Sequence, residues 1–177
     1  MISIAMSFAT KKHEPQTRKF NGEPYVNHCI RVAKTVRKYH LDNVAMEDLV
    51  VVALLHDTLE DTDTTYEELA ELFGAEVADM VRNLTNDENE IKLIGKPAHL
   101  AKKILLLTPS ELLVKLADRL DNVANMAELD PSKIEWVKQY SKQTELVFFN
   151  TLDIKKLDSS CHETILSEIW RHIEPYV

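Results

Sequence analysis

A histidine and an aspartate, His56 and Asp57, stand next to each other at the end of a long apolar run, LVVVALLHDTLED. Burying a carboxylate among apolar side chains is costly unless a counter-charge or a cation binds it. A hydrogen-bonded core histidine beside a surface aspartate is the more common explanation of such a pair alone, because this dipeptide often occurs by chance. The pair alone therefore leaves a structural and a functional interpretation open.

Two further residues favour a metal site. His28 lies on the apolar face of a predicted helix over residues 25–39, where an imidazole needs a polar partner. Asp118 is an acidic residue inside the apolar stretch LLVKLADRLDN, one turn after Val114. Two imidazoles and two carboxylates form a mixed nitrogen and oxygen set that suits a first-row divalent metal. The predicted metal ligands are His28, His56, Asp57 and Asp118.

Glu60 and Asp61 follow the histidine–aspartate pair by one helical turn. Negative charge is disfavoured at the C-terminal end of a helix, so two carboxylates there indicate a cation nearby. Four protein ligands leave positions on an octahedral ion for water and a phosphate oxygen, and the ion lowers the pKa of the water. A carboxylate one turn away can orient or deprotonate that water, which predicts a catalytic role. A solvated acidic helix end is the simpler alternative.

The elements expected to position these residues are helices. Glycine, which weakens helices, occurs only 3 times in 177 residues, and the apolar periodicity predicts about eight helices and no strand. A buried helix is expected to begin near Met46 and to continue past His56. Another helix is expected to start with Thr108 or Ser110 as its cap. Residues 87–97 are expected to be irregular.

Composition and charge narrow the classes of function. The net charge of -8 argues against a nucleic-acid surface, although a bound dication still admits a small anionic substrate. Cys29 and Cys161 are far apart and are expected to be free thiols, as in a reducing cytoplasm. No apolar stretch is long enough for a membrane span, and the N-terminus is unlike a signal peptide. We therefore expect a cytoplasmic protein with one domain over residues 1–177, whose oligomeric state the sequence leaves undetermined.

Four ordered motifs give the chain a family resemblance. They are PYxxH ending at His28, LLHDxxEDT over 54–62, FGxEVAxxVxxLT over 73–85 and VKLADRLxN over 114–122. On these motifs the chain resembles the hydrolase domain of the RelA/SpoT-type alarmone enzymes, in particular the small alarmone hydrolases of the HD phosphohydrolase superfamily. The resemblance implies an all-α, single-domain HD-type bundle of about eight to ten helices. It also implies manganese at the four predicted ligands, with another first-row divalent metal as the alternative, and Glu60 and Asp61 acting on the nucleophilic water.

The resemblance further implies a substrate. Family members remove the 3′-pyrophosphate from guanosine tetra- or pentaphosphate (ppGpp or pppGpp) and leave GDP or GTP. Arg18 and Lys19 match the basic pair that meets the nucleotide. Asn122 matches a position that helps to hold the nucleoside, and Asn125, one turn later, would extend that contact. Asp121 departs from the family pattern, where a larger side chain is expected, and this leaves its effect on phosphate binding open.

Two other functions remain as alternatives. An HD phosphohydrolase of the same shape would act on another nucleotide phosphate, such as a phosphorylated nicotinamide cofactor. A non-catalytic nucleotide-sensing module would be expected to lack a metal ligand or the acidic pair, and all of these residues are present. No synthetase or regulatory sequence follows Val177, so we expect no second activity. No role is predicted for His13, His40, His99, His162 and His172.

Overall fold

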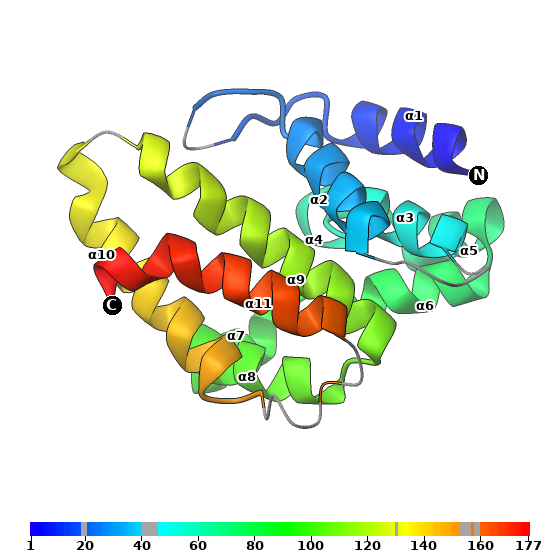
Figure 1. Ribbon diagram of the computed structural model, residues 1–177. Coiled ribbons are helices and arrows are strands. Elements are labelled where there is room, and N and C mark those ends of the chain that lie inside the picture. The colour runs from blue at the N-terminus through cyan, green and yellow to red at the C-terminus, as the bar shows by residue number, and fades with distance from the viewer. Residues whose placement is uncertain (19–20, 40–45, 130, 153–156, 158–159) are drawn as a thin grey trace. The chain divides into compact units, whose positions relative to one another are not determined.

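The computed structural model describes residues 1–18, 21–39, 46–129, 131–152, 157 and 160–177. These residues form helices and contain no strand, and a single isolated bridge among them pairs Thr17 with Pro24. The predicted all-α class is therefore confirmed. The chain divides into two compact units, Met1–Thr85 and Asn86–Val177, which are described in turn (Figure 1).

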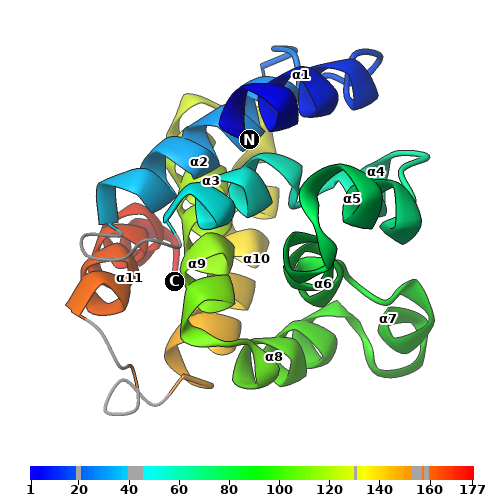
Figure 2. The same cartoon turned by 90° about the vertical axis from the view of Figure 1, so that its right-hand side faces the viewer.

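Helix α3 is the core of the first unit. Every residue from Leu49 to Leu55 is at most 5% exposed, as expected for a helix that is apolar on all sides. Helices α1, α2 and α6 pack against it. Figure 2 shows α5 and α6 adjoining each other in this unit. Its helices are α1 (Ile2–Lys12), α2 (Val26–Tyr39), α3 (Met46–Leu55), α4 (Thr58–Asp61), α5 (Tyr66–Phe73) and α6 (Ala75–Leu84).

Helices α9 and α11 lie side by side and form the main packing of the second unit (Figures 1 and 2). Helix α9 begins with the predicted cap, because the Thr108 side chain accepts from the Glu111 amide while Glu111 accepts from the Thr108 amide. No helix among the residues placed by the structure combines the length and the apolar composition needed to cross a bilayer. The elements of this unit are α7 (Glu88–Ile94), α8 (Lys96–Leu106), α9 (Pro109–Ala124), η1 (Asn125–Glu128), η2 (Pro131–Lys133), α10 (Ile134–Thr144), the π-helical turn η3 (Glu145–Phe149), α11 (Ser160–Ile173) and η5 (Glu174–Tyr176).

The prediction of irregular chain over residues 87–97 is wrong, because this segment contains α7 and the start of α8. The Asp87 side chain caps α7 by accepting hydrogen bonds from the amides of Asn89 and Glu90 at 2.8 and 3.1 Å. Glu90 also accepts a hydrogen bond of 2.6 Å from Nδ1 of His99 and pairs with Lys102, both on α8. A cap and an ion-pair cluster therefore stabilise a helix whose apolar pattern is short.

Candidate metal centre

The chain leaves its helical path at His56 and Asp57. The sequence predicts one helix continuing past His56, and this prediction is wrong, since α3 ends at Leu55 and α4 begins at Thr58. At the end of α3, two side chains form hydrogen bonds with main-chain carbonyl groups. Thr58 donates from its hydroxyl to the Leu55 carbonyl at 2.7 Å, and the His56 ring binds the Ala53 carbonyl through Nδ1 at 2.8 Å. These side-chain hydrogen bonds satisfy main-chain carbonyl groups at the helix end, where the chain makes a tight turn.

The turn brings two consecutive side chains to one point. Nε2 of His56 lies 3.1 Å from Oδ2 of Asp57, and Nε2 of His28 lies 3.6 Å from the same oxygen. The two imidazole rings meet edge to face, with centroids 5.3 Å apart. Both histidines are almost fully buried, at 1% and 3% exposure. Three of the four predicted metal ligands therefore converge within the first unit.

In its neutral form, the His56 ring would fit a cation. A carbonyl oxygen accepts only, so the bond to Ala53 assigns the proton of the neutral ring to Nδ1. Nε2 then directs a lone pair toward the Asp57 carboxylate, and two electron-rich atoms at 3.1 Å repel each other. A divalent metal held by these residues would offset this repulsion, and the Ala53 carbonyl would orient the His56 ring as a ligand.

Cys29 is a neighbour of the cluster that no sequence pattern predicted. Its sulfur lies within 4.8 Å of donor atoms of His56 and Asp57, and the residue is fully buried. Cys29 follows His28 directly in α2, so its proximity results from the packing of α2 on α3. The predicted ligand set contains no thiolate, a ligand that would favour softer metals.

Glu60 and Asp61 lie on α4, the short helix that follows the turn. Partial burial, and after it the negative charges of Asp57 and Glu60, raises the pKa of Asp61 above its ordinary value. A carboxylate whose pKa is raised is a stronger base than an ordinary one, which suits proton abstraction from water. The placement of this pair one turn after Asp57 agrees with the sequence pattern, and its catalytic role stays a prediction.

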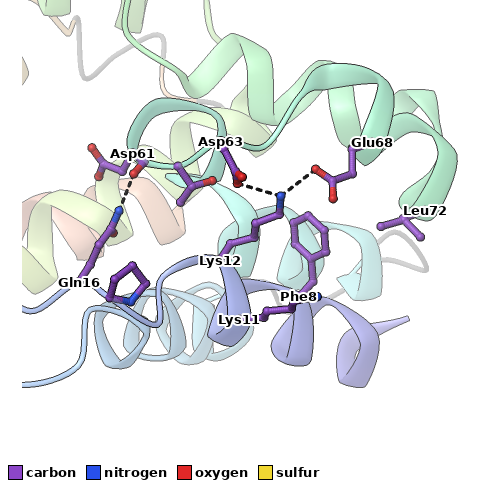
Figure 3. A pocket seen from close by; sticks show the side chains of 10 residues that line it. Phe8, Lys11, Lys12, Gln16, Asp61, Asp63, Glu68 and Leu72 are labelled. Carbon is purple, nitrogen blue, oxygen red and sulfur yellow. Dashed lines mark hydrogen bonds and ion pairs between the residues drawn. The ribbon is translucent and has the colours of Figure 1, made fainter.

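An open pocket with a volume of 850 Å³ adjoins Asp61 (Figure 3). Residues from the end of α1, from the loop after it and from the α4–α5 region line this pocket. Lys12 reaches across it and pairs with Asp63 and Glu68 at 2.9 and 3.0 Å. Gln16 reaches the main chain from below and donates to the carbonyl of Asp61. Hydrogen bonds and ion pairs thus connect the acidic end of α4 and the residues after it to α1 and the loop that follows α1.

Arg18, a predicted substrate residue, belongs to the loop between α1 and α2. Its amide donates to the Glu23 carbonyl at 2.8 Å, and its own carbonyl accepts from the Gly22 amide at 2.9 Å. Gly22 has φ of +73°, a left-handed conformation that glycine adopts without strain. The Arg18 guanidinium lies 5.7 Å from the centre of the Tyr25 ring. Lys19, the other half of the predicted basic pair, lies outside the described residues.

The remaining predicted residues are on α9 in the second unit. The buried carboxylate of Asp118 accepts a hydrogen bond of 2.6 Å from the Asn122 amide and lies 3.3 Å from the Lys115 ammonium. Asn125 donates to the Asp121 carbonyl at 2.7 Å. Asn122 is therefore in a position to orient Asp118. Metal binding by Asp118 and substrate contacts by Asn122 and Asn125 stay predictions.

Comparison with known proteins identifies the family. The sequence model of the family described as HD domain matches residues 5–150, which include parts of both compact units. The chain belongs to the HD domain family. The predicted resemblance is thereby confirmed at the level of the family.

This HD domain protein has named relatives in bacteria and animals. Over 128 residues it is 44% identical to guanosine-3′,5′-bis(diphosphate) 3′-pyrophosphohydrolase of Aquifex aeolicus, a match that covers 71% of this chain and 18% of that protein. The chain thus spans less than a fifth of that relative's length. It is 40% identical to guanosine-3′,5′-bis(diphosphate) 3′-pyrophosphohydrolase MESH1 of Homo sapiens, covering 72% of this chain and 70% of that protein.

A solved structure shares the fold. It is described as a metazoan ortholog of SpoT that hydrolyzes ppGpp and plays a role in starvation responses. The TM-score is 0.81 at 29% identity, and the match covers 96% of this chain and 93% of that chain. The likeness therefore extends over nearly the whole sequence, beyond the residues that the family model matches.

Proposed function

We propose that this HD domain protein hydrolyses the 3′-pyrophosphate of guanosine tetra- and pentaphosphate. The observation that carries the proposal is the convergence of His28, His56 and Asp57 on one point in a chain whose named relatives are ppGpp 3′-pyrophosphohydrolases. The products would be GDP or GTP together with pyrophosphate. The human relative supports this substrate more directly than the Aquifex relative does, because the match covers 70% of its length compared with 18%.

We propose manganese as the resident metal, held by the three clustered residues and by Asp118. The donor set supports a first-row divalent ion and does not distinguish manganese from its neighbours. The motif VKLADRLxN supplies Asp118, and Asn122 and Lys115 stabilise its ionised form within the second unit. A divalent metal here would lower the pKa of water and offset charge that develops at phosphorus.

The side chains of the chain would carry the proton and hold the nucleotide. Glu60 and Asp61 orient the attacking water and accept its proton, as the raised pKa of Asp61 supports. The water oxygen bonds to the phosphorus attached to the ribose 3′ oxygen. The bond from that phosphorus to the 3′ oxygen breaks, and the 3′ oxygen takes a proton as GDP leaves. Arg18, Lys19, Asn122 and Asn125 would bind the nucleotide.

A substrate panel tests the proposal. Purified protein is incubated with Mn²⁺ and ppGpp, pppGpp, a phosphorylated nicotinamide cofactor or simple nucleoside phosphates, and the phosphate and pyrophosphate released are measured separately. We expect pyrophosphate and GDP from ppGpp at a far higher kcat/KM than any product from the other nucleotides. Elemental analysis of the same sample reports its metal content. A metal-loaded protein that leaves ppGpp intact contradicts the substrate, and preferred turnover of another nucleotide replaces it.

A further inference from the structure

Tyr25, just before α2, contacts Oδ2 of Asp57, the atom on which the predicted metal ligands of the first unit converge. Its hydroxyl donates a hydrogen bond of 2.7 Å to Oδ2 of Asp57. The same oxygen faces Nε2 of His28 and Nε2 of His56. One hydrogen bond therefore restrains the rotation of a carboxylate that would otherwise turn freely about its terminal torsion.

The Tyr25 hydroxyl is also near Asp61, since its hydrogen-bonding interaction acts to lower the pKa of that carboxyl against the effect of burial. Asp57 and Asp61 are one helical turn apart, and the Asp61 amide donates to the Asp57 carbonyl at 2.9 Å. Tyr25 thus contacts a proposed metal ligand directly and lies near a proposed proton acceptor. A hydroxyl has one hydrogen to donate, and here it is donated to Asp57.

The ring of Tyr25 is held by stacking. His13, the C-cap residue of α1, stacks on it with centroids 4.9 Å apart and an interplanar angle of 29°. The His28 ring meets it edge to face at 5.7 Å. His13 is only 1% exposed, which is unusual for a histidine at the end of a surface helix. The contact therefore fixes the ring plane of Tyr25 from outside the metal cluster.

His13 is in turn oriented by Gln16. The Gln16 side-chain amide donates to the main-chain carbonyl of Asp61, so its other end, Oε1, faces His13. Nδ1 of His13 lies 2.7 Å from that oxygen and must carry the proton. A continuous series of contacts therefore runs from the Asp61 carbonyl through Gln16, His13 and Tyr25 to the Asp57 carboxylate.

We propose that Tyr25 is a positioning residue for Asp57, and that His13 and Gln16 hold it in place. The inference rests on the proposed function for its kinetic readout, while its metal-binding readout is independent of substrate. Outer-shell partners of metal ligands commonly change affinity by roughly 10- to 100-fold when removed. A residue that merely fills space at this position would change folding stability and leave metal affinity and kcat alone.

Tyr25→Phe tests the hydroxyl, because the substitution keeps the ring and its stacking. Mn²⁺ affinity is measured by calorimetric titration of the metal-free protein with Mn²⁺ alone. We expect the affinity to fall by about 10-fold, and kcat for ppGpp to fall by about 10-fold or more with little change in KM. The visible absorption of the Co²⁺-loaded protein should also change, because the Asp57 carboxylate turns.

Tyr66→Phe is the matched control. Tyr66 also donates a hydrogen bond, of 2.9 Å, to a carboxylate of the first unit, and its acceptor Asp79 is outside the cluster. This variant should keep wild-type Mn²⁺ affinity and kcat. The inference is overturned if Tyr25→Phe and Tyr66→Phe have the same Mn²⁺ affinity, the same kcat and the same Co²⁺ absorption spectrum. A wild type that binds Mn²⁺ without hydrolysing ppGpp rejects the proposed function, and the effect of Tyr25→Phe on Mn²⁺ affinity still decides the role of Tyr25.

The His13 contribution is tested by a double-mutant cycle. His13→Phe retains a ring above Tyr25 and loses the bond to Gln16, so we expect a loss of kcat smaller than that of Tyr25→Phe. If His13 acts through Tyr25, adding His13→Phe to Tyr25→Phe should cause little further loss. Losses that multiply in the double variant contradict this route. Thermal unfolding of every variant identifies any that fails to fold, and His13→Gln then takes its place.

Discussion

Nε2 of His56 and Oδ2 of Asp57 lie 3.1 Å apart although the two residues are consecutive. Consecutive side chains of an α-helix diverge by about 100°, so a continued helix would separate these atoms. The turn between α3 and α4 removes that separation. Its stabilising bonds come from His56 itself and from Thr58, which means that the ligand sequence also encodes the break.

Removing the charge of Asp57 should abolish tight metal binding. Asp57→Asn retains the shape and the acceptor oxygen but loses the negative charge that offsets the cation. We expect Mn²⁺ affinity to fall by more than the roughly 10- to 100-fold that is typical of outer-shell changes. Calorimetric titration measures the affinity, and Asp79→Asn, on α6 of the same unit, is the control. Wild-type affinity in Asp57→Asn would exclude this aspartate from the ligand set.

Neutralising Glu60 and Asp61 together should separate catalysis from metal binding. We expect the double variant Glu60→Gln, Asp61→Asn to lose about 10²- to 10⁴-fold in kcat, the range for positioned acid–base groups, while Mn²⁺ still binds. Steady-state kinetics and calorimetry provide the two readouts. Asp63→Asn, a nearby exposed carboxylate paired with Lys12, should retain kcat. Undiminished turnover in the double variant would mean that another group handles the water.

The Glu90 cluster should make the stability of the second unit sensitive to acid. Hydrogen bonds from Lys102, and then from His99, hold the pKa of Glu90 below its ordinary value of 4.5. The stabilisation is therefore present above pH 4.5 and is lost as the pH falls through the lower pKa of the folded state.

Glu90→Gln tests this dependence. The variant should have a lower Tm than the wild type above pH 4.5, and the difference should shrink as the solution is acidified below that value. Thermal unfolding followed by circular dichroism across this range measures it. Glu88→Gln, a substitution on the same helix, should show no such convergence. A Tm difference that is constant with pH would assign the effect of Glu90 to packing.

Loss of the capping box should destabilise α9, the helix that carries Asp118. Thr108→Ala removes the oxygen that accepts from the Glu111 amide, and we expect a loss of about 1 kcal/mol in the free energy of unfolding. Thr108→Ser keeps the hydroxyl and should lose much less. Urea denaturation measures both variants. Equal losses in the two would point to the methyl group of Thr108 as the source of its contribution.

Local chemistry accounts for the elements that sequence patterns predicted correctly. The Thr108 cap with Glu111 three residues later satisfies backbone amides within one turn, so it requires no distant contact. The apolar run from Leu49 to Leu55 predicted a buried helix for the same reason, since a helix without a polar face must lie inside. Helix α7 escaped prediction because much of its support comes from His99 and Lys102 on the next helix.

The sequence by itself determined the all-helical class, the HD domain motifs and the metal-competent side chains, because helix periodicity, caps and ligand chemistry are properties of residue type and spacing. Only the tertiary structure decided that Cys29 borders the cluster and that Tyr25 links His13 to Asp57. These features depend on aromatic stacking and hydrogen bonds between segments that are distant in the chain. Such contacts form only when packing brings the segments together, and no local pattern encodes them.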